Sequence, residues 1–188
     1  LVTVIATLPV AMTVTSALNA MAHSVEGLYA KNRTDATTAL ALEGLAAFQR
    51  SLPPVIANPA DLIAREGTQK GAWACGTVLG QVGMALHHKL CHTLGGALNL
   101  PHAETHAIIL PHAIAYNQPA AEAELAPVAA MFGQSDAARG LWDFARSLGA
   151  PTALRDLGVS EADLDRMADL ATTKPYRIPS FVISRGFR

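Results

Sequence analysis

A chain of 188 residues in which 51% of the side chains are apolar is long and apolar enough to bury the core of one globular domain. Its 14 basic and 15 acidic residues nearly cancel, which excludes the basic surface of a nucleic-acid-binding protein and favours a small-molecule substrate as the partner. The two cysteines, Cys75 and Cys91, form no CxxC pair and no disulfide framework. They indicate reduced thiols and a cytoplasmic location.

The first 22 residues carry no charge, a length that raises the question of a membrane span. Polar Thr, Ser and Asn side chains lie on both sides of Pro9, and the segment lacks a basic leader. We therefore expect no membrane insertion, but a buried strand followed by a helix. The chain opens within an apolar run, "LVTVIATLPV", as if a preceding element had been removed.

After Pro9, apolar residues recur every three or four positions, and this spacing predicts an all-α helical bundle over residues 1–173. Capping and helix-breaking residues set the expected boundaries. The expected helices run from a cap at Asp35 to the "LPP" at 52–54, from a cap at Asn58 to a break at 95–101, and then over 101–117, 121–133, 135–148 and 160–171.

Composition changes after residue 173. The segment "KPYRIPSFVISRGFR" has four basic residues, no acidic residue, two prolines and no helical period. We expect residues 174–188 to form a loosely packed, divergent basic tail, with the character of an ordinary chain terminus.

Six of the seven histidines lie between Met84 and His112, and the seventh is His23. Histidine is the commonest transition-metal ligand and titrates near neutral pH, so such a cluster indicates metal binding or proton transfer. Three polar pairs in the sequence are four residues apart and would each project from one face of a helix: Asn19 and His23, His88 and His92, and His102 and His106.

Facing helices that each supply such a pair are a common way to build a metal site inside a helical bundle. We expect His23, His88 and His102 to bind one divalent metal (Zn, Fe or Mn) together. His87, His106 and His112 are expected to be core or interface histidines whose nitrogens are satisfied by backbone carbonyls.

Three stretches resemble the C-terminal helical half of the iron-containing alcohol dehydrogenase family, and most closely its maleylacetate reductases. They are "LNAMAHSVEGLYA", "HHKLCHTLGGALNLPHAETHAIILPHAIAYN" and "LGAPTALRDLGVSEADLDRMA". In that family one Asp and three His bind the catalytic metal, and the matching positions here are Asn19, His23, His88 and His102. A further family histidine lies beside the nicotinamide and the substrate, and His92 matches it.

Two features depart from the family pattern. Asn19 stands where the metal-dependent dehydrogenases have Asp, and a neutral amide is a poorer ligand for a divalent cation than a carboxylate. The maleylacetate reductases resemble this chain in carrying Asn there. Family members also have an N-terminal nucleotide-binding domain that is absent from these 188 residues, and Gly95–Gly96 lacks the spacing of a dinucleotide fingerprint. We therefore expect no NAD binding by this chain alone.

With the helical half taken as the whole protein, the residues favour a metal-dependent hydrolase of activated esters or phosphoesters, such as a phosphotriesterase. A metal-bound hydroxide would be the nucleophile, with His92 or Glu104 as general base. Two alternatives stand beside this hypothesis: a fragment of an NAD(P)H-dependent maleylacetate reductase, which converts maleylacetate to 3-oxoadipate, and an inactive, self-associating helical domain. A truncated domain would expose an apolar face, so we also expect a homodimer or larger homo-oligomer.

Overall fold

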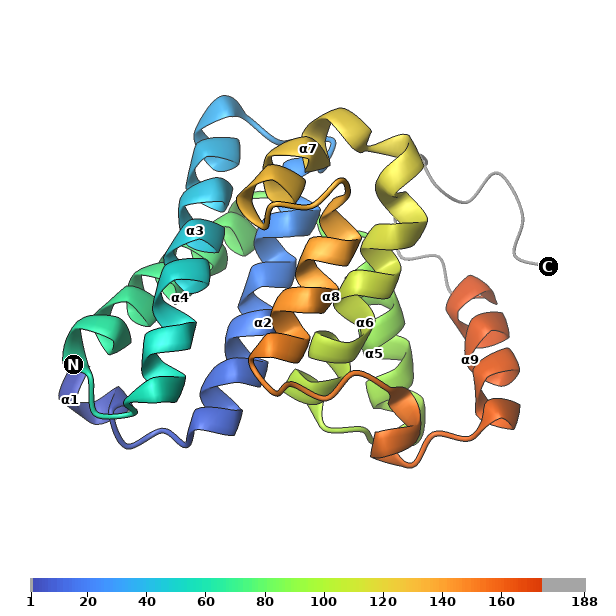
Figure 1. Ribbon diagram of the computed structural model, residues 1–188. Helices are drawn as coiled ribbons and strands as arrows, with labels where there is room; N and C mark the ends of the chain where they lie inside the picture. Colours follow the sequence, from blue (N-terminus) through green and yellow to red (C-terminus); the bar gives the residue numbers. More distant parts are fainter. Residues whose placement is uncertain (1, 174–188) are drawn as a thin grey trace.

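The computed structural model describes residues 2–173, and no strand occurs within that range (Figure 1). The predicted all-α fold is therefore confirmed. The helices are α1 (Val2–Ile5), α2 (Val10–Leu28), α3 (Asp35–Ala57), α4 (Leu62–Gln81), α5 (Leu86–Leu98), α6 (His102–Asn117), α7 (Glu122–Met131), α8 (Ala137–Ser147) and α9 (Glu161–Thr173), with short 3-10 turns at Gln118–Ala120 and Leu154–Leu157. The predicted tail at 174–188 lies outside the described residues.

Helix α2 runs through the middle of the bundle (Figure 1). It packs against the α3–α4 hairpin on one side and against α6 on the other, and α6 in turn packs against α5 and α8. Helix α7 packs on α8, and α9 packs on the outer side of α5. This arrangement brings one face of α2 toward α5 and α6, the two helices that carry the histidine-rich segment.

The sequence of α2 explains its central place. Leu18, Met21, Val25 and Leu28 are fully buried at spacings of three and four residues and form the stripe that fills the main core. Burying each such side chain stabilises the fold by about 1.5–3 kcal/mol. A second stripe on the same helix is polar, because Asn19, His23 and Glu26 follow the same helical spacing.

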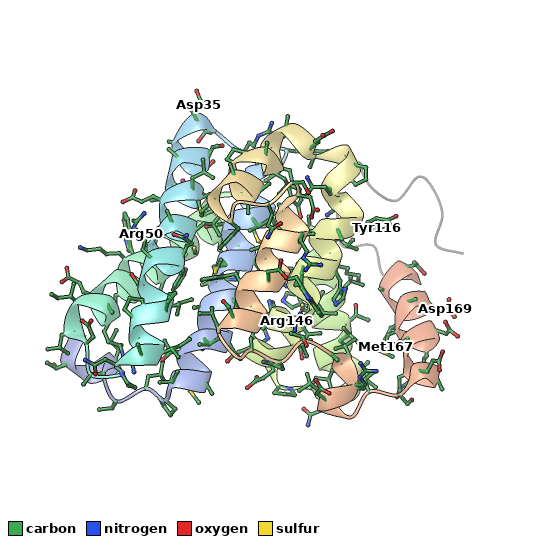
Figure 2. The ribbon with its side chains drawn as sticks, viewed as in Figure 1. Asp35, Arg50, Tyr116, Arg146, Met167 and Asp169 are labelled. Carbon is green, nitrogen blue, oxygen red and sulfur yellow. The ribbon has the colours of Figure 1, made fainter. Side chains whose placement is uncertain are left out.

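A smaller apolar cluster attaches α9 to the rest of the molecule. Met167 of α9 packs with Cys91 and Leu94 of α5 and with Ile109 of α6, while Asp169 points away from the bundle (Figure 2). The other cysteine, Cys75, is buried in the main core, and both thiols are free.

The expected strand at the start of the chain is wrong. Residues Val2–Ile5 form the short helix α1, which packs against α4. A lone strand would leave its backbone groups unpaired, whereas a helical turn satisfies them locally. Within the described part of the chain, no helix combines the length and apolar character needed to cross a membrane.

Three expected boundaries around α3 and α4 are also wrong. The N-cap of α3 is Thr34 rather than Asp35, because Thr34 Oγ1 accepts from the Thr37 N–H. Helix α3 continues through Pro53 and Pro54, and the helix closes with Asn58 N–H donating to the Pro54 carbonyl at 2.8 Å. Each proline removes one amide donor, so α3 lacks two backbone hydrogen bonds at this point. The N-cap of α4 is Asp61 rather than Asn58, because Asp61 Oδ1 accepts from the N–H groups of Ile63 and Ala64.

The long helix expected to lead into the histidines is in fact two helices, α4 and α5. Between them, Gly83 N–H donates to Asn32 Oδ1 at 2.9 Å and Ala85 N–H donates to Glu26 Oε2 at 2.8 Å. These acceptors come from distant parts of the chain and replace the helical bonds that a continuous helix would make. Helix α5 then continues past both glycines and ends at Asn99, whose φ of 52° is left-handed.

Candidate functional site

The histidine cluster lies where α2, α5 and α6 meet. The rings of His23 on α2 and His88 on α5 have centroids 5.0 Å apart, and the His88 ring is 5.2 Å from that of His106 on α6. The His102 and His106 rings, one turn apart on α6, are 4.1 Å apart. Histidines from all three predicted pairs therefore lie close together.

A buried carboxylate that the histidine spacing does not predict lies against this cluster. Glu26 on α2 is 0% exposed. Its Oε2 accepts from His88 Nδ1 at 2.7 Å and from Ala85 N–H at 2.8 Å, and its Oε1 accepts from His87 N–H at 2.7 Å. Although burial acts to raise the pKa of Glu26, the hydrogen bond from His88 and the neighbouring imidazoles hold that pKa below its ordinary value. Its position one turn beyond His23 on the polar stripe of α2 is the signal that could have found it.

Three side chains of the predicted metal site present buried polar atoms for which the described residues provide no hydrogen-bond partner. These atoms are Asn19 Oδ1, His23 Nδ1 and His88 Nε2. Two imidazole nitrogens and an amide oxygen are ligands that a divalent transition metal accepts. The donor set therefore fits the metal that the sequence predicts, with His102 at the exposed start of α6 as the fourth residue.

Three histidines of the cluster have pKa values well below the ordinary value, and metal binding requires neutral imidazoles. Burial, together with the nearby His88 and His87, lowers the pKa of His23 to about 4. Burial likewise lowers the pKa of His87 to about 4 and that of His106 to about 2. At neutral pH these three rings carry no charge.

The buried side of the cluster contains a second grouping. His87, His88 and His106 offer ring nitrogens that all lie within 4.8 Å of one another. This trio is not the predicted one, because it contains neither His23 nor His102. His87 Nε2 donates to the His106 carbonyl at 3.0 Å, as expected for a core histidine. The expectation for His106 is wrong, since both of its ring nitrogens are buried with no partner in the described chain.

The two side chains predicted as general bases occupy different positions. His92 is exposed, one turn beyond His88, and its ring centroid is 6.1 Å from that of His88. Partial burial, followed by the neighbouring His88 and His102, lowers the pKa of His92. Glu104 is half-buried in the first turn of α6. His112 lies away from the cluster, where its ring meets Trp142 on α8 at 5.5 Å.

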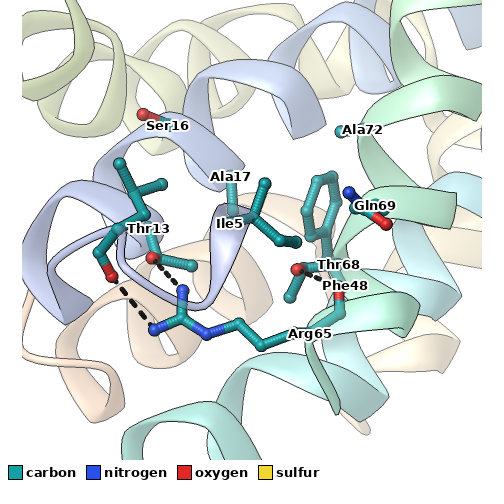
Figure 3. A pocket seen from close by; sticks show the side chains of 10 residues that line it. Ile5, Thr13, Ser16, Ala17, Phe48, Arg65, Thr68, Gln69 and Ala72 are labelled. Carbon is teal, nitrogen blue, oxygen red and sulfur yellow. Dashed lines mark hydrogen bonds between the residues drawn. The ribbon is translucent and has the colours of Figure 1, made fainter. Parts of the chain in front are cut away.

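A cavity of about 140 Å³ lies apart from the histidines, between α1, α2, α3 and α4 (Figure 3). Arg65 of α4, only 1% exposed, lies at its edge. The guanidinium donates to the Leu8 carbonyl at 3.0 Å, to Thr13 Oγ1 at 2.8 Å and to the Pro59 carbonyl at 3.0 Å. These contacts tie the α1–α2 and α3–α4 connections together, which gives Arg65 a structural role.

Comparison with known proteins places this geometry among dehydrogenases. Residues 13–181 match the model of the Fe-containing alcohol dehydrogenase family, C-terminal part. The chain is 57% identical over 181 residues to a maleylacetate reductase of Rhizobium sp. strain MTP-10005, and 51% identical over 172 residues to one of Pseudomonas sp. strain P51. These alignments cover 96% and 92% of this chain, but 51% and 49% of the relatives.

A solved structure is similar to this chain in both fold and sequence. The crystal structure of maleylacetate reductase from Agrobacterium tumefaciens superposes with a TM-score of 0.89 at 58% identity, covering 91% of this chain and 49% of that one. The chain thus spans about half the length of the curated relatives that it matches.

These similarities correct the main functional hypothesis. The similar proteins are named as reductases, so the prediction of a metal-dependent hydrolase, including a phosphotriesterase with Glu104 or His92 as general base, is wrong. That hypothesis depended on treating 188 residues as the whole protein, whereas the similar proteins are about twice as long. The alternative of a maleylacetate reductase fragment agrees better with the comparisons.

Proposed function

Because the chain belongs to the Fe-containing alcohol dehydrogenase family, we propose that it is the helical half of an NAD(P)H-dependent reductase of the maleylacetate reductase type. The observation that carries the proposal is that Asn19 Oδ1, His23 Nδ1 and His88 Nε2 are buried without a partner among residues 2–173, while the rings of His23 and His88 lie 5.0 Å apart. The similarity to maleylacetate reductases supports the choice of substrate class, an unsaturated oxo dicarboxylic acid.

Four side chains hold the divalent metal in this proposal: Asn19, His23, His88 and His102. The bound ion, Zn, Fe or Mn, supplies a Lewis acid that polarises the oxo group of the substrate. Each histidine ligand contributes a neutral nitrogen, and Asn19 contributes a neutral oxygen. The protein ligands therefore leave the positive charge of the ion uncompensated within the first coordination sphere, which favours an anionic substrate such as a dicarboxylate.

His92 is the proton-transferring residue in this proposal. His92 is exposed beside the cluster, one helical turn from His88, so a substrate can reach it without displacing a buried group. In its imidazolium form, His92 would stabilise negative charge on the substrate and give it a proton, leaving neutral imidazole, a role worth about 100-fold or more in rate. The hydride donor NAD(P)H is held by the nucleotide-binding domain that family members carry.

A chimera tests the proposal. The 188-residue chain is joined behind the N-terminal half of the Rhizobium relative, and oxidation of NADH is followed with maleylacetate as substrate. We expect maleylacetate-dependent oxidation that falls about 100-fold or more in His92→Ala. His112→Ala is the matched control, since His112 lies on α6 away from the cluster, and should retain the parent rate.

Two results would contradict the proposal. One is a folded chimera that binds NADH but does not oxidise it with maleylacetate, which would favour the inactive, self-associating domain. The other is equal activity in His92→Ala and His112→Ala.

A further inference from the structure

We propose that Glu26 is a positioning residue that fixes His88 in its Nδ1–H tautomer and joins α5 to α2, so that His88 Nε2, which is buried without a partner in the described chain, presents its lone pair within the histidine cluster. The inference rests on the proposed function in one respect, because the lone pair matters as a metal ligand.

Both oxygens of the Glu26 carboxylate accept hydrogen bonds. The two oxygens accept three hydrogen bonds of 2.7–2.8 Å, from Ala85 N–H, His87 N–H and His88 Nδ1. The Tyr29 hydroxyl donates to Oε1 at 3.5 Å. Every neighbour is thus a donor, and a fully buried carboxylate has no water to replace any of them.

The same carboxylate lies at the start of α5. Amide groups in the first turn of a helix have no partner within the helix. Ala85, the N-cap residue of α5, has no polar side chain, and Glu26 of α2 accepts from the Ala85 and His87 amides instead. One carboxylate therefore sets the start of the helix that carries His88 and ties it to the helix that carries Asn19 and His23.

These contacts also determine the tautomer of His88. An ionised carboxylate only accepts hydrogen bonds, so the proton in the 2.7 Å contact belongs to His88 Nδ1. His87 Nδ1, 3.3 Å from the same atom, is also an acceptor, because His87 uses its Nε2–H on the His106 carbonyl. A metal ligand must be a neutral imidazole, which has only one N–H, so in the form of His88 that binds a metal the Nε2 atom carries the lone pair. Carboxylate–histidine pairs of this kind orient metal ligands in many proteins.

Replacing the carboxylate with an amide of the same size would change the hydrogen bonding around residue 26. In Glu26→Gln the side chain gains an NH₂ group that must face at least one of these donors. His88 relieves the conflict by moving its proton to Nε2 and accepting at Nδ1. The lone pair then faces the new amide group instead of the metal site.

The test uses the 188-residue chain with ¹⁵N-labelled imidazoles, compared as wild type, Glu26→Gln and the control Glu43→Gln. Glu43 is an exposed residue on α3, so the control makes the same chemical change away from the cluster. Imidazole NMR reports which nitrogen of His88 carries the proton, and calorimetric zinc titration reports affinity. We expect Nδ1–H in the wild type and in Glu43→Gln, and Nε2–H with about 10–100-fold weaker zinc binding in Glu26→Gln.

The outcomes separate this inference from the proposed function. A wild-type chain that does not bind zinc would remove the metal from the proposed function, while a tautomer change in Glu26→Gln would still support the role of Glu26. A proton on His88 Nε2 in the wild type would overturn the inference even if Glu26→Gln did not fold. An unchanged tautomer and unchanged zinc affinity in a folded Glu26→Gln would also overturn it.

Discussion

Replacing His106 with leucine should stabilise the protein, although the substitution removes a polar residue from the candidate site. His106 is 1% exposed, and both ring nitrogens are buried without a partner in the described chain. Burial lowers the pKa of His106 to about 2, so the ring stays neutral at neutral pH. A neutral imidazole always has one donor and one acceptor, and each unsatisfied buried group costs about 1–3 kcal/mol.

Leucine is apolar and similar in size to histidine, so it removes both unsatisfied groups at once. An imperfect fit of the new side chain costs about 1 kcal/mol. We therefore expect the free energy of unfolding to rise by about 1–5 kcal/mol. Urea denaturation of the metal-free chain, with a chelator present, should show the midpoint rising by about 0.5–2.5 M with an unchanged m-value of about 2 kcal/mol/M.

His112→Leu is the matched control because His112 is exposed on the same helix, and its midpoint should stay close to that of the wild type. A loss of about 1 kcal/mol or more in His106→Leu would refute the reasoning. It would mean that the His106 nitrogens are satisfied in the folded protein, for example by ordered water.

Three further predictions concern other parts of the molecule. Stability should fall as the pH drops from about 6.5 to 4, because His23 and His87 stay neutral in the folded chain while the same residues of the unfolded chain take up protons. For His87 the difference between pKa values of 6.5 and about 4 corresponds to about 3 kcal/mol of stability. Urea midpoints that do not change across this pH range would contradict the prediction. Arg65→Met should lower the free energy of unfolding by about 2–4 kcal/mol, because it removes three hydrogen bonds of a buried guanidinium. A melting temperature equal to that of the wild type would contradict this prediction. Light scattering should show a homodimer or larger assembly, because Ile63 and Trp73 expose 85% and 66% of their surface on α4, and a monomer at high concentration would argue against it.

The helices could be predicted from the sequence because their causes are local. The apolar stripe of α2 at Leu18, Met21 and Val25 is visible as a spacing, and the helix expected over 101–117 forms as α6 at His102–Asn117. The break between α4 and α5 could not be predicted in the same way. It depends on Glu26, which accepts from residues 59 to 62 positions away in the sequence.

The candidate site also combines features that the sequence predicts with features that depend on helix packing. Four-residue spacing indicates which histidines share a face of one helix, and the rings from α2, α5 and α6 lie close together in the structure. It gave no indication that His106 would be left without a partner in the described chain, because that depends on how three helices pack together. The hydrolase hypothesis failed for a different reason: a set of ligand residues describes a metal site, but it does not decide which reaction is carried out there.

The most direct test of the central claim is anomalous diffraction at the zinc absorption edge from crystals of the chain grown with zinc. The account predicts one strong peak within bonding distance of His88 Nε2, with His23, His102 and Asn19 as the other protein ligands. A peak bound by His87 and His106 on the buried side of the cluster, or crystals with no peak at these histidines, would contradict it.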